Sequence, residues 1–268
     1  MAIHGLWTGQ GYYLADSRTD DSWWLDGSYT APPNLTLRDA TIGSVHTDNF
    51  WSGILSTWGP STITDGIHVG AFSGFAIDQQ RVGSLELDGN SSVGYHTRFE
   101  INGGGGPYLS LTLNGTLALN TASSVIDTDV TGNGNIVLSG HGGGTELGGS
   151  VSGGETIWCL EGGLQIDQPQ LMHGTIEGLG DGITLKGIGD GAAADAKLTA
   201  TDFTFTSMIY HSDGTTSSGV TDLRIQDTPY HQVVMRYAGG PDGNGSVLLS
   251  AQTSPVGALP QYVVHQTA

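Results

Sequence analysis

The sequence predicts an all-β protein, a right-handed parallel β-helix (β-solenoid) with non-repeating segments at both ends. Three observations support this prediction. Stretches in which apolar and polar residues alternate strictly, each bounded by Gly, Asn or Asp, fill most of the chain from about residue 35 to about residue 250. A short motif recurs at intervals of about 25 residues. Gly makes up 44 of the 268 residues without a Gly-X-Y period, which indicates many tight turns.

The recurring motif is apolar, any residue, apolar, polar, glycine. Its copies are "LELDG" (85–89), "LTLNG" (111–115), "IVLSG" (136–140) and "ITLKG" (183–187). Their starts lie 26, 25 and 47 residues apart, and "LQIDQ" (164–168) stands near the place of the missing copy. Such spacing favours about eight stacked coils, each adding about 4.8 Å of length. We expect Asn114-Gly115 to be a coil corner, with Leu111 and Leu113 stacked between neighbouring coils.

The alternative fold is a β-sandwich or jelly roll, whose strands follow one another at about 8 to 12 residues without a longer period. Within the solenoid we expect three segments. Residues 1–34 are rich in aromatic side chains and fit no repeat, which predicts an arm or a cap. Residues 35–245 form the expected solenoid, and residues 246–268 an apolar tail. Because the ends of a coil stack expose its core, these end segments either cover it or reach another molecule.

The charge balance excludes some partners. The chain has 26 acidic and 8 basic residues, a formal charge of -18 and a sequence pI of about 4.4. Binding to phosphate backbones or anionic membranes needs clustered Lys and Arg, so we expect no nucleic-acid partner. No apolar run is long enough to insert into a membrane. Cys159 is the single cysteine, and its neighbours predict a buried thiol.

Acidic residues supply the candidates for chemistry. Asp127 and Asp129 share one face of an expected strand, and glycan-cleaving enzymes use such carboxylate pairs. Asp181 and Asp190 lie nine apart in "GLGDGITLKGIGDGA" (178–192), where oxygen ligands could hold Ca²⁺, although the match to calcium-binding repeats is partial and the pattern favours plain Asp-Gly turns. We expect no cofactor, with Ca²⁺ as the alternative, and no catalytic residue.

Residues 80–190 resemble the passenger β-helices of bacterial autotransporters and related secreted adhesins. The likeness lies in lines such as "GNGNIVLSGHGGG" (132–144) and "LTLNGTLALN" (111–120). The resemblance implies a long, passive scaffold and supplies no active-site residue. Together with a composition rich in Gly, Thr, Ser and Asp and poor in Lys, it leads us to expect an extracellular or cell-surface location, although "MAIHGLWTGQ" (1–10) has no signal-peptide pattern.

These observations favour a non-enzymatic structural subunit of an extracellular filament or surface layer, assembling head to tail with itself. The expected interface residues are Trp7, Tyr12, Tyr13, Trp23, Trp24, Tyr262, Val263 and Val264. One alternative is a glycan-binding or polysaccharide-cleaving β-helix of tail-spike type, with aromatic platforms along an exposed groove. Another is an adhesin that acts as a monomer.

Overall fold

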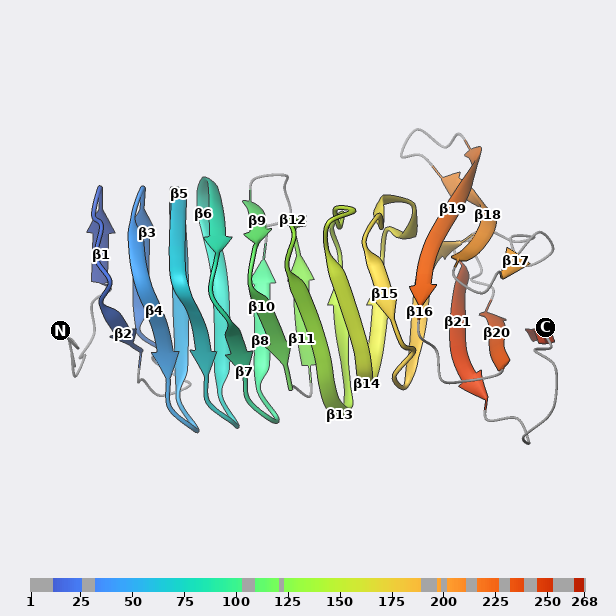
Figure 1. Ribbon diagram of the computed structural model, residues 1–268, viewed down its shortest axis with the longest axis horizontal. Coiled ribbons are helices and arrows are strands. Elements are labelled where there is room, and N and C mark those ends of the chain that lie inside the picture. Colours follow the sequence, from blue (N-terminus) through green and yellow to red (C-terminus); the bar gives the residue numbers. More distant parts are fainter. Residues whose placement is uncertain are drawn as a thin grey trace.

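The chain folds as a parallel β-solenoid of about 7 turns, which confirms the predicted fold class. The computed structural model describes residues 12–25, 32–102, 109–120, 123–188, 197–198, 202–210, 216–226, 232–238, 245–252 and 263–267. Figure 1 shows the coils side by side along one axis, from β1 at one end to β16. Within these residues the one helix is the short 3-10 turn η1 (Pro169–Leu171). No helix of the described part has the length and hydropathy needed to cross a membrane.

Each coil has three sides, which we name faces A, B and C in chain order. Long strands bend from one face to the next, and β5 runs across all three. The strands of face A are β1 (Tyr12–Ala15), β3 (Asn34–Arg38), β5 (Ser52–Val69), β6 (Gly74–Leu87), β8 (Arg98–Asn102), β11 (Ser123–Asp127), β13 (Asn135–Leu147), β14 (Thr156–Ile166) and β16 (Gly182–Ile188). Faces B and C add β4 (Thr41–Thr47), β9 (Leu109–Leu113) and β12 (Asp129–Gly132), then β2 (Ser22–Trp24), β7 (Ser91–Val93), β10 (Thr116–Leu119) and β15 (Thr175–Glu177).

The core is a set of columns, each made of the residues at equivalent positions in successive coils. The inward column of face A is aliphatic throughout and consists of Leu35, Leu55, Ile77, Ile101, Ile126, Leu147, Ile166 and Leu185. All eight side chains are at most 1% exposed. Full burial of one such side chain contributes about 1.5 to 3 kcal/mol, so the alternation read from the sequence is also what drives the coils to stack.

The stretch "LTLNGTLALN" forms a coil corner, as predicted. Leu111 and Leu113 pair with Leu85 and Leu87 in the preceding coil. Asn114, at the corner, donates hydrogen bonds of 2.9 Å from Nδ2 to the carboxylates of two acidic residues one coil earlier, Glu86 and Asp88. The corner therefore joins consecutive coils through polar side chains as well as through the core.

The two later copies of the motif, "IVLSG" and "ITLKG", lie on other faces, so the expectation that they stack in the column of Leu111 is wrong. Ile136 of "IVLSG" pairs with Leu117 on face C. Ile183 of "ITLKG" pairs with Leu164 on face A, so "LQIDQ" is its neighbour in the stack. Any strand that ends in a tight corner can carry these five letters, whichever face it lies on.

Coil length varies, which explains why a constant period fails. The coil from Ile101 to its partner Ile126 takes 25 residues, whereas the coil from Ile166 to Leu185 takes 19. The inward columns on face A stay in register across this difference. The corners therefore take up the variation in coil length. Because the motif copies lie on different faces, the number of residues between them is not the length of a coil.

The expected segment boundaries also need correction at both ends. β1 and β2 pair in parallel with β3 and β4, so the described part of the expected arm or cap of residues 1–34 is a coil of the stack. At the other end, parallel stacking on face A stops at β16, well before residue 245, because β21 (Gly245–Gln252) pairs with β16 in antiparallel orientation.

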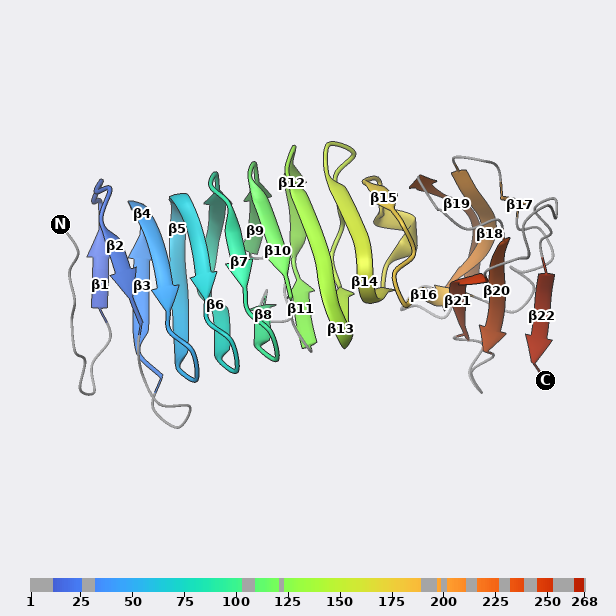
Figure 2. The same cartoon turned by 60° about the horizontal axis from the view of Figure 1, so that its bottom comes forward.

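The C-terminal strands form a mixed arrangement beyond the last coil (Figure 2). β19 continues face C by pairing in parallel with β15, and it also forms an antiparallel pair with β18. β20 pairs with β21 and β22, so the described residues of the expected tail 246–268 are strands as well. The strands of this part are β17 (Lys197–Leu198), β18 (Asp202–Tyr210), β19 (Thr216–Gln226), β20 (Gln232–Ala238) and β22 (Val263–Thr267).

Replacing Gly115 by Ala is expected to destabilise the solenoid by about 1 to 3 kcal/mol. A Cβ at this corner would lie 2.1 Å from the carbonyl oxygen of Gly89 in the preceding coil, so the backbone must shift. Urea unfolding measures the effect. Gly153→Ala is the matched control, since its Cβ would lie 3.5 Å from its nearest neighbour, the carbonyl oxygen of His173. Equal stability of the two variants would contradict the close packing of the corners.

Candidate functional site

The corner between faces C and A carries exposed aromatic side chains on three successive coils. We call this set the aromatic ridge; it consists of Phe50, Trp51, Phe72, Tyr95 and His96. Phe50 is 70% exposed, Phe72 52%, and Trp51 and Tyr95 42% each. These four are half of the exposed large hydrophobic side chains among the described residues. The ridge is therefore a concentrated apolar feature on a strongly acidic protein.

The ridge is built by the stacking of the coils. The Phe50 N–H donates to the Ala71 carbonyl at 2.9 Å, and the Phe72 N–H donates to the Tyr95 carbonyl at 2.9 Å, which aligns the three corners. The Phe50 and Phe72 rings stack with centroids 5.2 Å apart, and the Phe72 and His96 rings lie 5.4 Å apart. One ring per coil thus stacks along the solenoid axis, as the core residues do.

The backbone of the ridge is strained. Phe50, Phe72 and His96 have φ values of 67°, 56° and 55°, in the left-handed region where Gly or Asn is usual. Holding a bulky residue there costs on the order of 1 to 3 kcal/mol. Because the Phe50 and Phe72 rings are exposed, core packing does not compensate for this cost. Strain of this kind, repeated at one position of three coils, is typical of a functional surface.

A groove of about 300 Å³ lies on face A beside the ridge. Its floor includes the small residues Ser52, Gly74 and Ala76 of adjacent coils. Arg98 and Glu100 line the same groove and form an ion pair with each other, with the Arg98 side chain 63% exposed. The groove therefore combines a low floor with one cation and one anion at its wall.

Ridge and groove form one site, because the chain runs directly from one to the other. Trp51 immediately precedes Ser52, Phe72 stands two residues before Gly74, and His96 stands two residues before Arg98. An apolar edge, a flat floor and a charged pair thus lie next to one another. Such a combination is typical of small-molecule and chain-binding sites.

Sequence analysis missed this site, although a signal exists. Phe50, Phe72 and His96 are separated by 22 and 24 residues, one coil each, and each stands two residues before the start of a face A strand. Recognising that signal requires the register of face A, which the motif spacing did not provide. The aromatic residues that the sequence prediction singled out, in residues 1–34 and at Tyr262, were interface candidates.

The described aromatic residues of the expected assembly interface contact rings of their own chain. Tyr12 packs edge-on against Trp23 at 5.7 Å. Tyr13 packs against Trp58 at 6.1 Å, and Trp24 stacks on His46 at 4.7 Å.

The other expected interface residues lie nearer the ends of the chain. Val263 and Val264 lie in β22, beside β20. Trp7 and Tyr262 lie outside the described residues.

The expected carboxylate pair is separated by a bend, so the prediction that it shares one face is wrong. Asp127 ends β11 on face A, whereas Asp129 begins β12 on face B, with Thr128 at the corner between them. Asp129 Oδ1 accepts hydrogen bonds from the Ser150 hydroxyl at 2.6 Å and the Ser150 N–H at 2.8 Å, and these lower the pKa of Asp129. Such a carboxylate stays ionised and suits a corner contact better than a general acid.

The weak calcium candidates are not brought together. Asp181 lies exposed in the turn before β16, and its N–H donates to the Gly162 carbonyl. Asp190 lies outside the described residues. Across the described ranges, no group of three or more His, Cys, Asp or Glu residues has a geometry suited to a metal ion.

Cys159 is the buried thiol that the sequence predicts. Its side chain is 3% exposed in the core of face C. Burial raises the pKa of this thiol to about 12, so it is protonated and unreactive at neutral pH.

No protein-family model matches this chain, and no curated protein matches it either. The aromatic ridge and its groove are therefore the features from which a function is inferred.

Glu155 is a buried carboxyl away from this site. Its side chain is 1% exposed and lies where Gly132 leaves the core unfilled, since a Cβ on Gly132 would be 3.0 Å from Glu155 Oε1. Neither carboxylate oxygen makes a well-formed hydrogen bond with a described residue. Burial raises the pKa of Glu155 to about 7, against a smaller opposite effect of the Gly134 backbone.

The raised pKa of Glu155 predicts a loss of stability with rising pH. The folded protein holds the proton up to about pH 7, whereas the unfolded chain releases it near 4.5. The contribution of this group is therefore complete below pH 4.5 and is lost as the pH rises through 7, a change of about 3 kcal/mol. Urea unfolding from pH 4 to 8.5 should show this slope in the wild type and a flatter profile in Glu155→Gln. Glu177→Gln, a half-buried carboxyl on face C, is the control and should keep the wild-type slope; an unchanged slope in Glu155→Gln would refute the assignment.

Proposed function

We propose that this protein is a carbohydrate-binding β-solenoid that holds a glycan on the aromatic ridge and in the groove beside it. One observation carries the proposal: three successive coils place an exposed ring at the same strained corner, next to a groove with a paired cation and anion. We assign the site a binding role and no catalytic residue.

The chemistry of the site matches that of a sugar. A pyranose ring has apolar C–H faces and a rim of hydroxyl groups. Exposed rings such as Trp51 and Phe50 offer apolar contact to the C–H faces of the sugar. The Arg98 guanidinium can donate hydrogen bonds to hydroxyl oxygens, and the Glu100 carboxylate can accept them. Ser52, Gly74 and Ala76 keep the floor low, so a flat ring can approach the sheet.

Charge separates this proposal from a nucleic-acid-binding one. Single-stranded nucleic acids also stack on exposed aromatic rings, but their phosphates need a positively charged groove. This chain has 8 basic residues against 26 acidic ones, and Arg98 in the groove is already paired. A ligand without phosphates therefore suits the site better.

The exposed ring of Phe50 gives a test that separates function from folding. Phe50→Gly removes the ring and relieves the left-handed backbone, so stability should stay equal or rise by about 1 kcal/mol. Affinity for oligosaccharides that bind the wild type should fall about tenfold or more, as for a central aromatic contact. Thermal unfolding and isothermal titration calorimetry measure the two effects.

Trp158→Ala is the matched control, because this exposed ring lies on face C, away from the ridge. It should bind like the wild type. If Phe50→Gly binds with the affinity of the wild type, whether or not its stability changes, the ridge has no role in binding.

A second proposal, end-to-end assembly, rests on β1. This strand pairs with β3 along one edge, and no described strand pairs with its other edge. An open parallel edge is a template for another chain, and a head-to-tail contact that does not close produces a filament. Tyr13 in this strand is 52% exposed.

Electron microscopy tests this second proposal. The purified chain should form filaments, and Tyr13→Lys, which places a charge at the edge, should reduce them to short particles. Leu160→Lys is the control, since Leu160 is 58% exposed but lies several coils from β1. Discrete rods in the wild type would rule out end-to-end assembly under those conditions.

A further inference from the structure

Face A presents two continuous columns of outward-facing residues. The first runs from Ser52 through Gly74, Arg98, Ser123 and Gly144 to Gly182, and with one exception its members are Gly or Ser. The second runs beside it from Ile54 to Thr184. The registers along these columns have no bulge, so each coil adds one row to the same straight path.

A second groove of about 290 Å³ lies farther along this path. Ser123, Gly144 and Gly163 of the first column line it, together with Glu146, Gln165 and Thr184 of the second. The groove beside the ridge and this second groove therefore follow the same two columns. We call the path that joins them the face A trough.

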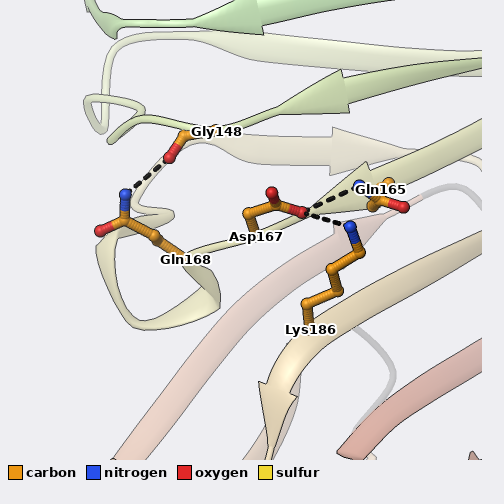
Figure 3. A network of polar contacts seen from close by, with 5 residues as sticks. All are labelled: Gly148, Gln165, Asp167, Gln168 and Lys186. Carbon is orange, nitrogen blue, oxygen red and sulfur yellow. Dashed lines mark hydrogen bonds and ion pairs between the residues drawn. The ribbon is translucent and has the colours of Figure 1, made fainter. Parts of the chain in front are cut away.

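A polar network holds one side of the far end of the trough (Figure 3). Gln165 Nε2 donates to Asp167 Oδ1 at 2.9 Å, and Lys186 Nζ lies 3.4 Å from the same oxygen. Gln168 Nε2 donates to the Gly148 carbonyl at 2.6 Å. Of these residues Gln165 lines the groove, and the hydrogen bond to Asp167 orients its amide.

The two ends of the trough have different characters. The near end is bordered by the aromatic ridge, whereas the far end is bordered by polar side chains, with Leu160 exposed at the same corner of the coil. Burial, and after it the charge of Asp167, raises the pKa of Glu146. Arg98 is paired with Glu100 in the trough, and Lys186 is paired with Asp167 beside it.

We infer that a single polysaccharide chain runs along the solenoid axis through both grooves, and that it is a neutral, extended chain with equatorial linkages. This inference rests on the proposed glycan-binding function. Seven rows at about 4.8 Å give a trough of roughly 30 Å. Only a chain that stays straight and flat follows such a path, whereas axially linked chains coil away from it. The paired charges give no preference to an ionised sugar, and the net charge of -18 disfavours a polyanion.

Affinity as a function of ligand length tests the inference on the full chain. The probes are β-1,4-linked gluco- and xylo-oligosaccharides of two to eight units, with α-1,4-linked gluco-oligosaccharides of the same lengths for comparison. Occupying the second groove is intramolecular once the first is filled, so the affinity for the longest β-linked chains should exceed that for the trisaccharides by about 10²-fold. Equal affinity for α- and β-linked chains would overturn the linkage assignment.

Gly144→Leu blocks the trough without straining the backbone. A Cβ at Gly144 would lie 3.6 Å from the Gly163 carbonyl oxygen, an ordinary contact, and the added side chain fills the second groove. This variant should lose the gain with length and keep the wild-type affinity for trisaccharides. Gly153→Leu, exposed and outside face A, is the matched control and should retain the gain.

The outcomes separate this inference from the proposed function. If trisaccharides bind and Phe50→Gly weakens them, but longer chains gain nothing, the trough is wrong and the ridge site stands. If Gly144→Leu keeps the length dependence, the chain does not pass through the second groove. If no oligosaccharide binds at any length, both proposals fail.

Discussion

The whole structure depends on one constraint: successive coils stack in parallel register, with each residue directly above its equivalent. Inward positions are then mostly apolar, and the column from Leu35 to Leu185 is apolar in every coil, because a polar residue there would face apolar neighbours on both sides. Corners must let backbones approach closely, which Gly115 and Gly89 allow. The same constraint aligns the outward residues, so the ridge and the trough are surface continuations of the order in the core.

Sequence reasoning recovered the parts of this order that are local. Alternation and Gly-rich corners predict the solenoid, and the placing of Leu111 and Leu113 follows from neighbouring copies of one motif. The assignment of the later copies to one column failed because coils differ in length, and a strand pattern of five residues does not encode its face. Asp127 and Asp129 were separated by a bend at Thr128 that alternation alone does not reveal. The ridge was missed because its rings become neighbours only through the register.

Two departures from regular stacking show how the constraint is met locally. At Gly132 the core column lacks a side chain, and the carboxyl of Glu155 from the next coil occupies the space, at the cost of a buried ionisable group. At the ridge, left-handed residues with exposed rings cost backbone free energy and return no core packing. The first departure repairs the interior. The second leaves the interior unchanged and places aromatic rings on the surface.

Coil length varies between 19 and 25 residues on face A while its columns remain in phase. A corner can therefore gain or lose residues without displacing a single row of the faces. Duplication or deletion of a whole coil would likewise change the extent of the molecule by one row and leave the other rows intact. The length of this surface is therefore set by the number of coils, and it changes in steps of one strand spacing.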